Sequence, residues 1–491
     1  MFKKNHLFNN ASKFWLSNSN LATKVTMPEC SFTPQKYQGP KYEDVVQTRR
    51  ENLSKGNFPY YKENVMIHQG HKQWLWDTNG KRYLDLFAGI VTVSVGHCHP
   101  KVNAALEEQI KKLWHTTTIY HYPGIHEYTH KLLKKFPSKF GVVLYTNSGS
   151  EANDLAMYIS RLYTGKFDII SLRNGYHGMS PYTMGITNLS TWKYNVPTGF
   201  GIHPTMNPDI FKGPWGGKQC RDSPIQALRD CSCEPGECQA GDNYSNQVQD
   251  ILLYCAPKGG KVAAMIVESI QGVGGAVQYP KNFLKNSAKM VQSAGGLVIS
   301  DEVQTGFGRT GSNYWGFENH EILPDIVTMA KGIGNGFPMA AVVTTKEIAD
   351  VLGQAAYFNT FGGNPMACAV GSAVLDVIDE EKLQENCQVV GTYFLNELAK
   401  LRDEFEIIGD VRGKGLMIGL ELVEDKKSKK PLNLDRVLNI FETSKNMGIL
   451  VGRGGLYGNV FRIKPPMCIT KEDVDFGVYV LREAIHKESK N

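Results

Sequence analysis

Short apolar runs alternate with amphipathic segments between about residue 100 and residue 345 of this 491-residue chain. Segments such as EANDLAMYISRLYTG and PKNFLKNSAKMVQSAG carry their apolar residues at the spacing of one helix face. The apolar runs themselves have the length of buried strands and are GVVLYT (141–146), FDIISL (167–172), VAAMIVE (262–268), GLVISDE (296–302) and DIVTMA (325–330). This alternation predicts an α/β fold with a mainly parallel central sheet and helices on both faces.

The segments on either side predict a second, smaller α/β unit. The stretch MIHQGHKQWLWDTNGKRYLDLFAG has the pattern of a hairpin around the turn Asp77-Thr78-Asn79-Gly80. Beyond residue 370 the chain predicts long helices, one strand over GKGLMIGLELV and a helical C-terminus. We therefore expect a leader and linker (1–40), an N-terminal segment that joins the small domain (41–95), a large domain (96–370) with a Cys-rich insertion (204–250), and the C-terminal small domain (371–491).

Composition narrows the classes of function. Hydrophobic residues make up 42% of the chain and charged residues 21%, which is ordinary for a globular protein. The net charge of +6 comes from scattered basic residues, so no basic stripe indicates nucleic-acid binding. No apolar run reaches the ~18 residues that a bilayer span requires. We predict a protein that acts on small molecules, with neither nucleic acid nor a membrane as its partner.

The first 25 residues have the composition of a targeting segment. They contain four lysines, several serines and asparagines, and no acidic residue. Leu7, Ala11 and Phe14 fall on one helical face, which is typical of a transit peptide, although arginine is missing. We predict import into the mitochondrial matrix, and a disordered cytosolic tail is the alternative interpretation.

Four of the ten cysteines fall in one polar stretch, namely Cys220 and the segment CSCEPGEC with Cys231, Cys233 and Cys238. Four thiols together could hold a zinc ion, but C-x-C-x4-C lacks the usual paired C-x2-C spacing. We therefore predict free thiols in a surface insertion and no metal site.

Polar residues follow the predicted strands at the carboxyl ends, where open α/β sheets bind ligands. After VVLYT the chain passes through Ser148-Gly149-Ser150 directly into a helix. Backbone N–H groups at such a glycine-containing helix start, together with hydroxyl groups, can bind a phosphate. The alternative is an ordinary helix cap. The stretch is neither a Walker A loop nor a dinucleotide-binding motif.

An acid and a lysine end two further strands. Asp301 ends GLVISD, and Lys331 follows DIVTMA at the start of a glycine-rich loop. Each could be an ordinary residue, since Asp301 could cap a helix or pair with Arg309, and Lys331 could cap an exposed strand. With the helix start, however, they supply what pyridoxal 5'-phosphate requires: a phosphate anchor, a carboxylate for the ring nitrogen and an amine for the aldehyde. Burial at the sheet edge would lower the pKa of this lysine, as a nucleophilic amine needs.

The motifs SGSEAN, YHG, SDEVQTGFGRTG, MAKGIGNGFP, FNTFGGNP and GDVRGKGLMIG follow one another in this order. In this respect the chain resembles class III pyridoxal-phosphate aminotransferases, and the resemblance covers residues 45 to 485. It implies the architecture of fold type I PLP-dependent transferases and a homodimer or tetramer. It also implies an active site that the neighbouring subunit completes.

The resemblance assigns roles to residues of the cofactor site. Lys331 corresponds to the lysine that forms a Schiff base with the cofactor, and Asp301 to the partner of the pyridine nitrogen. Gln304 matches the residue that bonds the ring hydroxyl, and Tyr176 the aromatic residue that stacks on the ring. The implied phosphate-binding residues are Gly149, Ser150 and, from the neighbouring subunit, Thr360.

Two further residues resemble substrate-binding residues of the family. Arg412 lies between glycines in GDVRGKG, where a guanidinium could bind a carboxylate through two hydrogen bonds, although a solvated turn arginine is the simpler interpretation. Glu268 matches a glutamate that pairs with this arginine and moves away when substrate enters, but Ser269 follows it where the family has proline. Ile90 stands where ornithine aminotransferases have a tyrosine, which argues against ornithine as the substrate.

The implied reaction is ping-pong transamination with small amino acids and keto acids as substrates. L-alanine or a β-amino acid such as 3-aminoisobutyrate would donate the amino group, glyoxylate or pyruvate would accept it, and Lys331 would transfer the proton. Three alternatives stay open: an ω-aminotransferase of the 4-aminobutyrate or acetylornithine type, a phospho-lyase for amino-alcohol phosphates, and a scaffold protein that has kept the fold. Intact Lys331, Asp301 and Gln304 argue against the scaffold.

Overall fold

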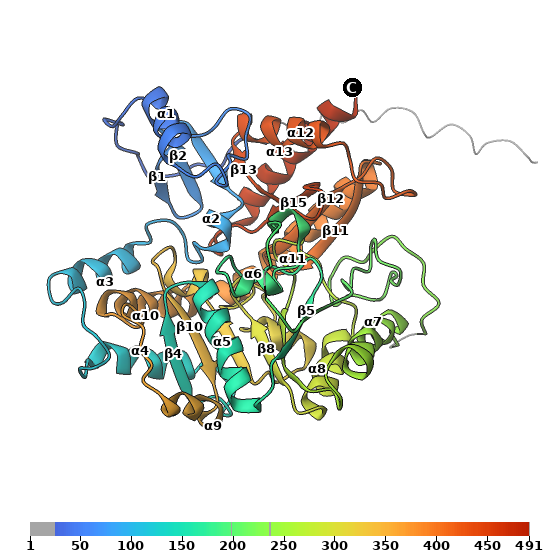
Figure 1. The fold of residues 1–491 in the computed structure, drawn as a ribbon. Coiled ribbons are helices and arrows are strands. Elements are labelled where there is room, and N and C mark those ends of the chain that lie inside the picture. The colour runs from blue at the N-terminus through green and yellow to red at the C-terminus, as the bar shows by residue number, and fades with distance from the viewer. Residues whose placement is uncertain (1–24, 198, 235–236, 491) are drawn as a thin grey trace, which may run out of the picture.

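The protein is represented by a computed structural model, which describes residues 25–197, 199–234 and 237–490. The segment 1–24, which holds nearly all of the predicted transit peptide, lies outside these residues. In Figure 1 the central sheet and its helices fill the lower half, and the N-terminal strands β1 and β2 lie near the C-terminal helices above them. Within the described residues, every helix is too short or too polar to cross a membrane.

The central sheet has seven strands. Strand β10 pairs antiparallel with both of its neighbours, whereas the other pairs are parallel. From one edge to the other the order is β4 (Val142–Thr146), β10 (Ala340–Thr344), β9 (Ile326–Met329), β8 (Leu297–Asp301), β7 (Val262–Glu268), β5 (Asp168–Leu172) and β6 (Ile202–Thr205). All five apolar runs that predicted strands form strands of this sheet, so the prediction of a mainly parallel sheet is confirmed.

The two faces of this sheet belong to two different hydrophobic clusters. Along β8, Val298 belongs to one cluster, while Leu297 and Ile299 on either side of it belong to the other. This alternation follows from the strand period of two and buries both faces. The helices that pack on the two faces are α5 (Gly149–Thr164) on one, and α8 (Phe283–Ser293) and α10 (Pro365–Glu380) on the other. The prediction of helices on both faces is confirmed.

Helix α5 is fixed at the carboxyl end of β4 by its own sequence. The hydroxyl of Ser148 accepts a hydrogen bond from the N–H of Glu151 (3.2 Å) and so caps the helix. At the other end Gly165 takes the left-handed conformation (φ +62°) that commonly ends a helix. Between these caps Leu155 and Ala156 are buried against the sheet. The helix N-terminus therefore points toward the edge where the predicted site lies.

The rest of the chain forms two four-stranded sheets. Strand β3 pairs parallel with β13, so the N-terminal strands share a sheet with a C-terminal strand. The first sheet contains β1 (Ile67–His71), β2 (Trp74–Asp77), β3 (Arg82–Asp85) and β13 (Ile449–Leu450). The second contains β11 (Ile408–Lys414), β12 (Met417–Leu422), β15 (Val460–Ile463) and β14 (Gly452–Gly454).

Two details of the small unit differ from the sequence prediction. The predicted N-terminal hairpin is a three-stranded unit, because the chain turns twice, after β1 and after β2. The predicted single strand over GKGLMIGLELV is the end of β11 followed by β12. Gly415 takes a left-handed conformation (φ +55°) between them, which permits the tight reversal.

The remaining helices differ in burial, from Tyr42–Asn52, in which no residue is buried, to Leu383–Glu404 and Lys471–Ser489, each of which buries a whole face. They are α1 (Tyr42–Asn52), α2 (Ala88–Val91), α3 (Pro100–Ile110), α4 (Pro123–Leu133), α6 (Thr183–Ile186), α7 (Gln239–Asp250), α9 (Lys346–Ala349), α11 (Leu383–Glu404), α12 (Leu434–Asn446) and α13 (Lys471–Ser489). Short 3-10 or π turns are η1 (Ser190–Trp192), η2 (Ile251–Cys255), η3 (Gly316–His320), η4 (Lys331–Gly334) and η5 (Asp350–Gln354). Helix α1 thus lies in the predicted N-terminal segment (41–95), and the Cys-rich insertion ends in α7.

Candidate active site

Three adjacent parallel strands carry the predicted polar residues at their carboxyl ends. Glu268 on β7 lies opposite Asp301 on β8, and Asp301 lies opposite Thr328 on β9. Lys331 follows β9 directly. Glu268, Asp301 and Lys331 line one cavity of about 260 Å³, together with Gly149, Ser150, Tyr176 and Gln304. The structure therefore brings together every predicted cofactor-site residue except Thr360.

The loop that carries Lys331 is held by residues from the N-terminal part of the chain. The Ser94 hydroxyl donates to the carbonyl of Gly332 (2.8 Å), and the Asn335 side chain accepts from the N–H of Val95 (2.9 Å). Lys331 itself has a φ of +52°, in the left-handed region that a lysine seldom adopts. These contacts hold the strained backbone so that its side chain points into the cavity.

The amine of Lys331 has an altered proton affinity. Burial lowers its pKa, and the positive charge of Arg462 lowers it further. The negative charges of Asp301 and Glu268 act in the opposite direction, and the resulting pKa is about 8. A sizeable fraction of this amine is therefore unprotonated near neutral pH, as the sequence prediction required of a nucleophile.

Asp301 is fixed by a buried hydrogen-bond network that the sequence did not predict. Its Oδ2 atom accepts from Nδ1 of His177 (2.8 Å) and from the amide of Asn153 (2.9 Å). The hydroxyl of Thr328 donates to Asn153 (2.6 Å) and fixes the orientation of that amide. Arg309, the alternative partner considered for Asp301, donates instead to the carbonyls of Leu416 and Pro465.

The same network raises the pKa of His177. Burial by itself lowers the pKa of His177, but its hydrogen bond to Asp301 and the charges of Asp301 and Glu268 outweigh burial and raise it above the ordinary value. The protonated form of His177 is therefore favoured beside the buried carboxyl group of Asp301, which accepts its hydrogen bond.

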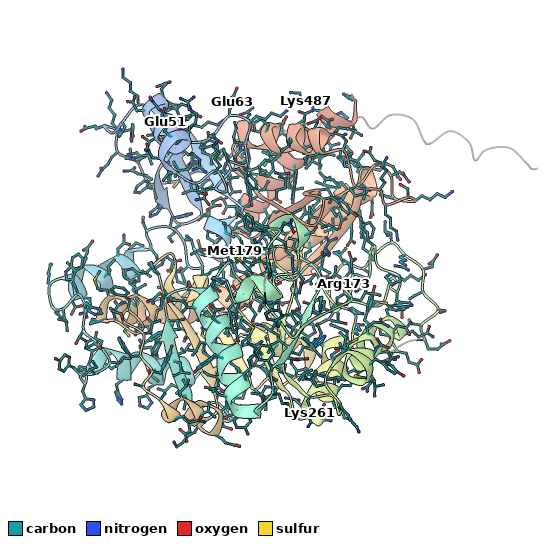
Figure 2. The ribbon with its side chains drawn as sticks, in the orientation of Figure 1. Glu51, Glu63, Arg173, Met179, Lys261 and Lys487 are labelled. Atoms are coloured by element: carbon teal, nitrogen blue, oxygen red, sulfur yellow. The ribbon has the colours of Figure 1, made fainter. Side chains whose placement is uncertain are left out.

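The start of α5 provides hydrogen-bond donors at one end of the cavity. Among the described residues, no acceptor lies within hydrogen-bond reach of the N–H groups of Gly149 and Ser150. A Cβ atom at Gly149 would approach Val303 to 3.1 Å, so only glycine leaves this space open without displacing a neighbour. The Ser150 hydroxyl accepts from the N–H of Met179 (3.1 Å), a residue near the centre of the molecule in Figure 2. These groups have the arrangement of an anion site.

Gln304 lies between two buried basic side chains. Its Oε1 atom accepts from Arg462 (3.2 Å) and from Nζ of Lys464 (3.1 Å). A Cβ atom at Gly272 would come within 2.3 Å of the Gln304 oxygen, so this glycine gives the side chain its room. The Nε atom of Arg462 is buried and has no hydrogen-bond partner within the part of the chain that the structure describes. Arg462 therefore retains donor capacity at the cavity.

Aromatic side chains and Glu268 form another wall. The Tyr176 ring meets Trp192 edge to face, with 5.2 Å between the ring centres. Glu268 accepts from the N–H groups of Tyr176 (3.0 Å) and Gly272 (2.6 Å). Burial raises the pKa of Glu268 above its ordinary value. This carboxyl group thus holds the two loops that border the cavity.

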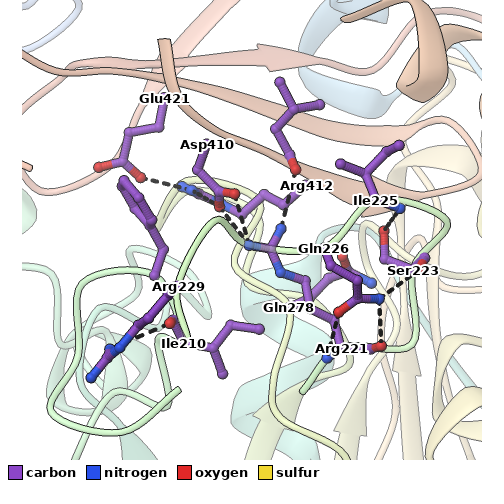
Figure 3. A network of polar contacts seen from close by, with 12 residues as sticks. Ile210, Arg221, Ser223, Ile225, Gln226, Arg229, Gln278, Asp410, Arg412 and Glu421 are labelled. Carbon is purple, nitrogen blue, oxygen red and sulfur yellow. Dashed lines mark hydrogen bonds and ion pairs between the residues drawn. The ribbon is translucent and has the colours of Figure 1, made fainter. Parts of the chain in front are cut away.

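Arg412 does not lie where the sequence prediction placed it. Its guanidinium donates to the carbonyl of Gly275 (2.8 Å) and pairs with Glu421 (2.7 Å) and Asp410 (3.0 Å), as Figure 3 shows for the two acids. Burial lowers its pKa, but these acidic neighbours outweigh burial and raise it. The predicted pair between Arg412 and Glu268 is not formed. These three buried contacts hold the guanidinium group of Arg412 outside the cavity.

Thr360 also lies apart from the other predicted residues. It is exposed to solvent and does not line the cavity of its own chain. This position is compatible with the prediction that it acts in a neighbouring subunit.

Sequence reasoning missed three residues of the site: Asn153, His177 and Arg462. For Arg462 a signal existed, since VFRIKPP places a charged residue inside an apolar strand. Such a residue is buried only when partners or a ligand compensate it. Asn153 and His177 gave no comparable signal, because their importance follows from tertiary contacts with Asp301.

The chain belongs to the class III aminotransferases. It matches the family Aminotransferase class-III over residues 58–485, and its parallel sheet with an amine, a carboxylate and a helix N-terminus around one cavity agrees with that membership. It is 56% identical over 475 residues to alanine–glyoxylate aminotransferase 2, mitochondrial, of Homo sapiens, which covers 96% of this chain and 92% of the human protein.

Two further comparisons extend this relationship. Identity is 46% to alanine–glyoxylate aminotransferase 2 homolog 2, mitochondrial, of Arabidopsis thaliana, over 94% of this chain and 92% of that protein. The fold is similar to that of a phospholyase from Arthrobacter in complex with phosphoethanolamine, with a TM-score of 0.80 and 31% identity over 90% of this chain and 99% of that one. Proteins that catalyse different reactions therefore share this architecture.

Membership of the family implies pyridoxal phosphate as the cofactor, and the residues of the cavity fit such a group. Unpaired N–H groups of Gly149 and Ser150 suit a phosphate. The Lys331 amine, with its pKa of about 8, suits an aldehyde. Asp301, fixed by His177, suits a protonated ring nitrogen. A phosphate, an aldehyde and a basic ring nitrogen are the three reactive parts of this cofactor.

Proposed function

We propose that this chain transfers the amino group of L-alanine, or of a β-amino acid such as 3-aminoisobutyrate, to glyoxylate or pyruvate. The main support is the convergence of Lys331, Asp301 and the α5 N-terminus on one cavity at the carboxyl ends of β7, β8 and β9. The name of the human relative, 56% identical over 96% of this chain, supports alanine and glyoxylate as the substrates. The chemistry of each residue follows from its surroundings.

Lys331 is the proposed catalytic base and acid. When bound, pyridoxal 5'-phosphate supplies an aldehyde that joins an amine and a ring that takes up electrons from the adjacent carbon. The Lys331 amine, with a pKa of about 8, can take a proton from the donor carbon and return it to a neighbouring one. A lysine with an ordinary pKa near 10.5 would be protonated too completely to act as the base.

Asp301 is proposed to hold a proton on the ring nitrogen. Its two hydrogen bonds from His177 and Asn153 fix one oxygen (2.8 and 2.9 Å). The other oxygen accepts from the N–H of Val303 (3.0 Å). This support orients the carboxylate before any ligand arrives, so the electrostatic stabilisation needs no rearrangement. Gln304 and Tyr176 are proposed to contact the ring hydroxyl and the ring face, in agreement with their places on the cavity wall.

Arg462 is proposed to bind the carboxylate of the amino acid or keto acid. It lines the cavity, whereas Arg412 does not, and its buried Nε has no partner among the described residues. A guanidinium can bind a carboxylate through two parallel hydrogen bonds. Arg462 thereby takes the substrate role that the sequence prediction gave to Arg412, and Glu268 borders the same cavity as a further substrate-site residue.

A homodimer is proposed to complete the site. Large apolar side chains from two loops are exposed on one face, with Trp114 62%, Ile119 76%, Tyr120 68%, Phe358 61% and Phe361 60% accessible. The rings of Phe361 and His115 lie 5.5 Å apart, so the two loops adjoin. An exposed apolar patch of this kind commonly marks a protein interface. Thr360 belongs to this patch and would reach the phosphate of the other subunit.

The mitochondrial matrix is the proposed location. The human and Arabidopsis relatives are both named as mitochondrial proteins. The basic, acid-free composition of the first 25 residues supports the same destination. Fusion of these residues to a fluorescent protein, followed by imaging and protease protection of isolated mitochondria, tests it.

An absorbance spectrum of the purified protein tests the proposed reaction. We expect the near-visible band of cofactor attached to Lys331, its loss on addition of L-alanine alone, and its return on addition of glyoxylate. Loss and return together require a cofactor that carries the amino group between two substrates. The variant Lys331→Ala is the control and should not show this band.

Other outcomes would contradict specific parts of the proposal. A band that alanine leaves unchanged, but that phosphoethanolamine converts with release of phosphate, would indicate a phospho-lyase. A band that is lost only on addition of 4-aminobutyrate or acetylornithine would indicate that one of these amines is the donor. Absence of the band in protein supplied with pyridoxal phosphate would contradict the cofactor site itself.

A further inference from the structure

The cysteines of the insertion lie together in space. The described residues between β6 and α7 form neither helix nor strand. A loop of this length usually needs another means of support. Within this stretch the sulfur atoms of Cys220, Cys231 and Cys233 all lie within 4.8 Å of one another. Cys220 is completely buried. The expectation of four thiols on the surface is therefore wrong for this residue, and also for Cys238, which is 3% exposed.

Cys238 lies beside this group of three and contacts it through Cys220. It lies immediately before α7, and its sulfur accepts a hydrogen bond from the Cys220 thiol. Further hydrogen bonds come from the backbone N–H groups of Ala240 and Gly241 at the helix start. The geometry therefore places Cys238 directly beside the group of three cysteines, in contact with Cys220.

The loop is also folded closely around Cys231. The sulfur of Cys231 accepts hydrogen bonds from the N–H groups of Lys218, Gln219 and Cys233. A Cβ atom at Gly217 would lie 2.1 Å from the Cβ of Cys231, so only glycine permits this approach. Backbone N–H donors directed at sulfur stabilise a thiolate, and such outer contacts commonly orient metal ligands.

We propose that Cys220, Cys231, Cys233 and Cys238 bind one zinc ion in a tetrahedral site. Four thiolates form a closed structural site, in which each thiol releases its proton when the metal binds. Zn–S bonds of about 2.3 Å place the sulfur atoms about 3.8 Å apart, which the three clustered sulfurs can reach with small side-chain movements. Soft sulfur ligands favour zinc over magnesium or calcium. The site lies outside the catalytic cavity.

The position of the site gives it a structural purpose. Arg221, next to Cys220, is 1% exposed and binds Asp410 of β11 through two hydrogen bonds (2.7 and 2.9 Å). Asp410 also pairs with Arg412 (3.0 Å), as Figure 3 shows. On the other side the carbonyl of Cys220 accepts from the N–H of Lys281 (2.7 Å), just before α8. The zinc ion would therefore fix the point where the insertion joins the central sheet region to the small unit.

Metal analysis of the full chain tests the proposal. The holoenzyme is expressed with zinc and purified without chelators. We expect about one zinc ion per chain, measured by inductively coupled plasma mass spectrometry. Cys231→Ser should lose nearly all of this zinc. Cys255→Ser, which changes an exposed cysteine outside the cluster, should retain it. Replacement of zinc by cobalt should give thiolate charge-transfer bands and strong red absorption typical of a tetrahedral site.

Wild-type measurements decide the matter even if Cys231→Ser fails to fold. Zinc near one per chain, together with four thiols that become reactive only after the metal is released, would support the proposal. Wild-type protein without zinc would overturn it, whether peptide mass spectrometry finds four free thiols or disulfide bonds among these cysteines. Zinc that persists in Cys231→Ser at the wild-type level would place the metal elsewhere and would also overturn it.

Discussion

Asp301 Oδ2 lies 2.8 Å from Nδ1 of His177, and each residue is only 3% exposed. An ionised carboxylate without a partner would be unstable at this depth. The ring of His177 supplies that partner, and the other oxygen of Asp301 accepts from the N–H of Val303 in the loop after β8. The proposed acceptor for the ring nitrogen therefore depends on a residue that itself takes no part in bond changes.

His177→Gln is expected to lower kcat/KM about 10- to 100-fold, because a hydrogen bond to a charged group contributes about 1.5–3 kcal/mol. The affinity for the cofactor should fall as well, which equilibrium dialysis measures. His203→Gln is the matched control. It removes a similar pair with Asp168 (2.8 Å), located on β5 and β6 and outside the cavity. Equal losses of activity in both variants would contradict a specific role for His177.

The raised pKa of His177 also predicts a pH dependence of stability. Because the folded-state pKa lies above the unfolded value of about 6.5, the pair contributes its full stability below that pH. This contribution is lost as the pH rises through the folded-state pKa. Urea unfolding of wild type and His177→Gln should therefore differ most at low pH, and a difference that grows with pH would contradict the assignment.

Lys331 is expected to capture pyridoxal phosphate at a rate that rises about tenfold per pH unit below pH 8 and then levels off. The reason is that only the unprotonated amine attacks the aldehyde, and the pKa of this amine is about 8. Stopped-flow absorbance of cofactor-free protein measures the rate. In Asp301→Asn the inflection should move to lower pH, since the charge of Asp301 raises the pKa. A rate that keeps rising toward the ordinary lysine pKa of about 10.5 would contradict the lowered value.

The sequence predicted most of this site because of a general property of parallel sheets. Strands end at a common edge, so residues that follow GLVISD and DIVTMA had to lie close together. Apolar runs also made these strands recognisable, and both are strands of the central sheet. Asp301 and Lys331 could therefore be placed in one cavity without any knowledge of tertiary contacts.

The substrate arginine could not be placed in the same way. Arg412 and Arg462 both lie on strands of the small unit, β11 and β15, and both are almost completely buried. Which of them reaches the cavity depends on how that unit packs against the central sheet. The side chain of Arg412 pairs with Asp410 on its own strand and with Glu421 on the adjacent strand β12.

Arg462→Gln and Arg412→Gln are therefore expected to fail in different ways. Loss of Arg462 should raise KM for alanine and glyoxylate about 10- to 100-fold, because a charged hydrogen bond to the carboxylate is lost, and should leave stability nearly unchanged. Loss of Arg412 should destabilise the fold by about 1.5–3 kcal/mol, since Asp410 and Glu421 would each lose a buried charged hydrogen bond and keep only Arg221 and Lys212 as partners. Steady-state kinetics and urea unfolding separate these effects.

An amine without a carboxylate provides the control for this comparison. If Arg462 binds the substrate carboxylate, such a donor should react equally well with wild type and Arg462→Gln. A raised KM for alanine in Arg412→Gln with unchanged stability would restore the role that the sequence resemblance assigned to that residue.

Thr360 allows a direct test of the proposed dimer, because its own chain keeps it away from the cavity. Thr360→Glu would introduce a negative charge against the phosphate and should inactivate the enzyme, as Lys331→Ala should. In a hybrid dimer of these two variants, one site would combine an intact Lys331 with an intact Thr360 from the partner subunit. Co-expression should therefore restore about a quarter of wild-type activity, since about half of randomly formed dimers are hybrids with one working site each.

The matched control is Asp301→Asn with Lys331→Ala, where both changed residues line the cavity of their own chain and no hybrid site is intact. Restored activity in the first pair and none in the second would establish that Thr360 acts across the interface, whereas none in either would assign it to its own chain.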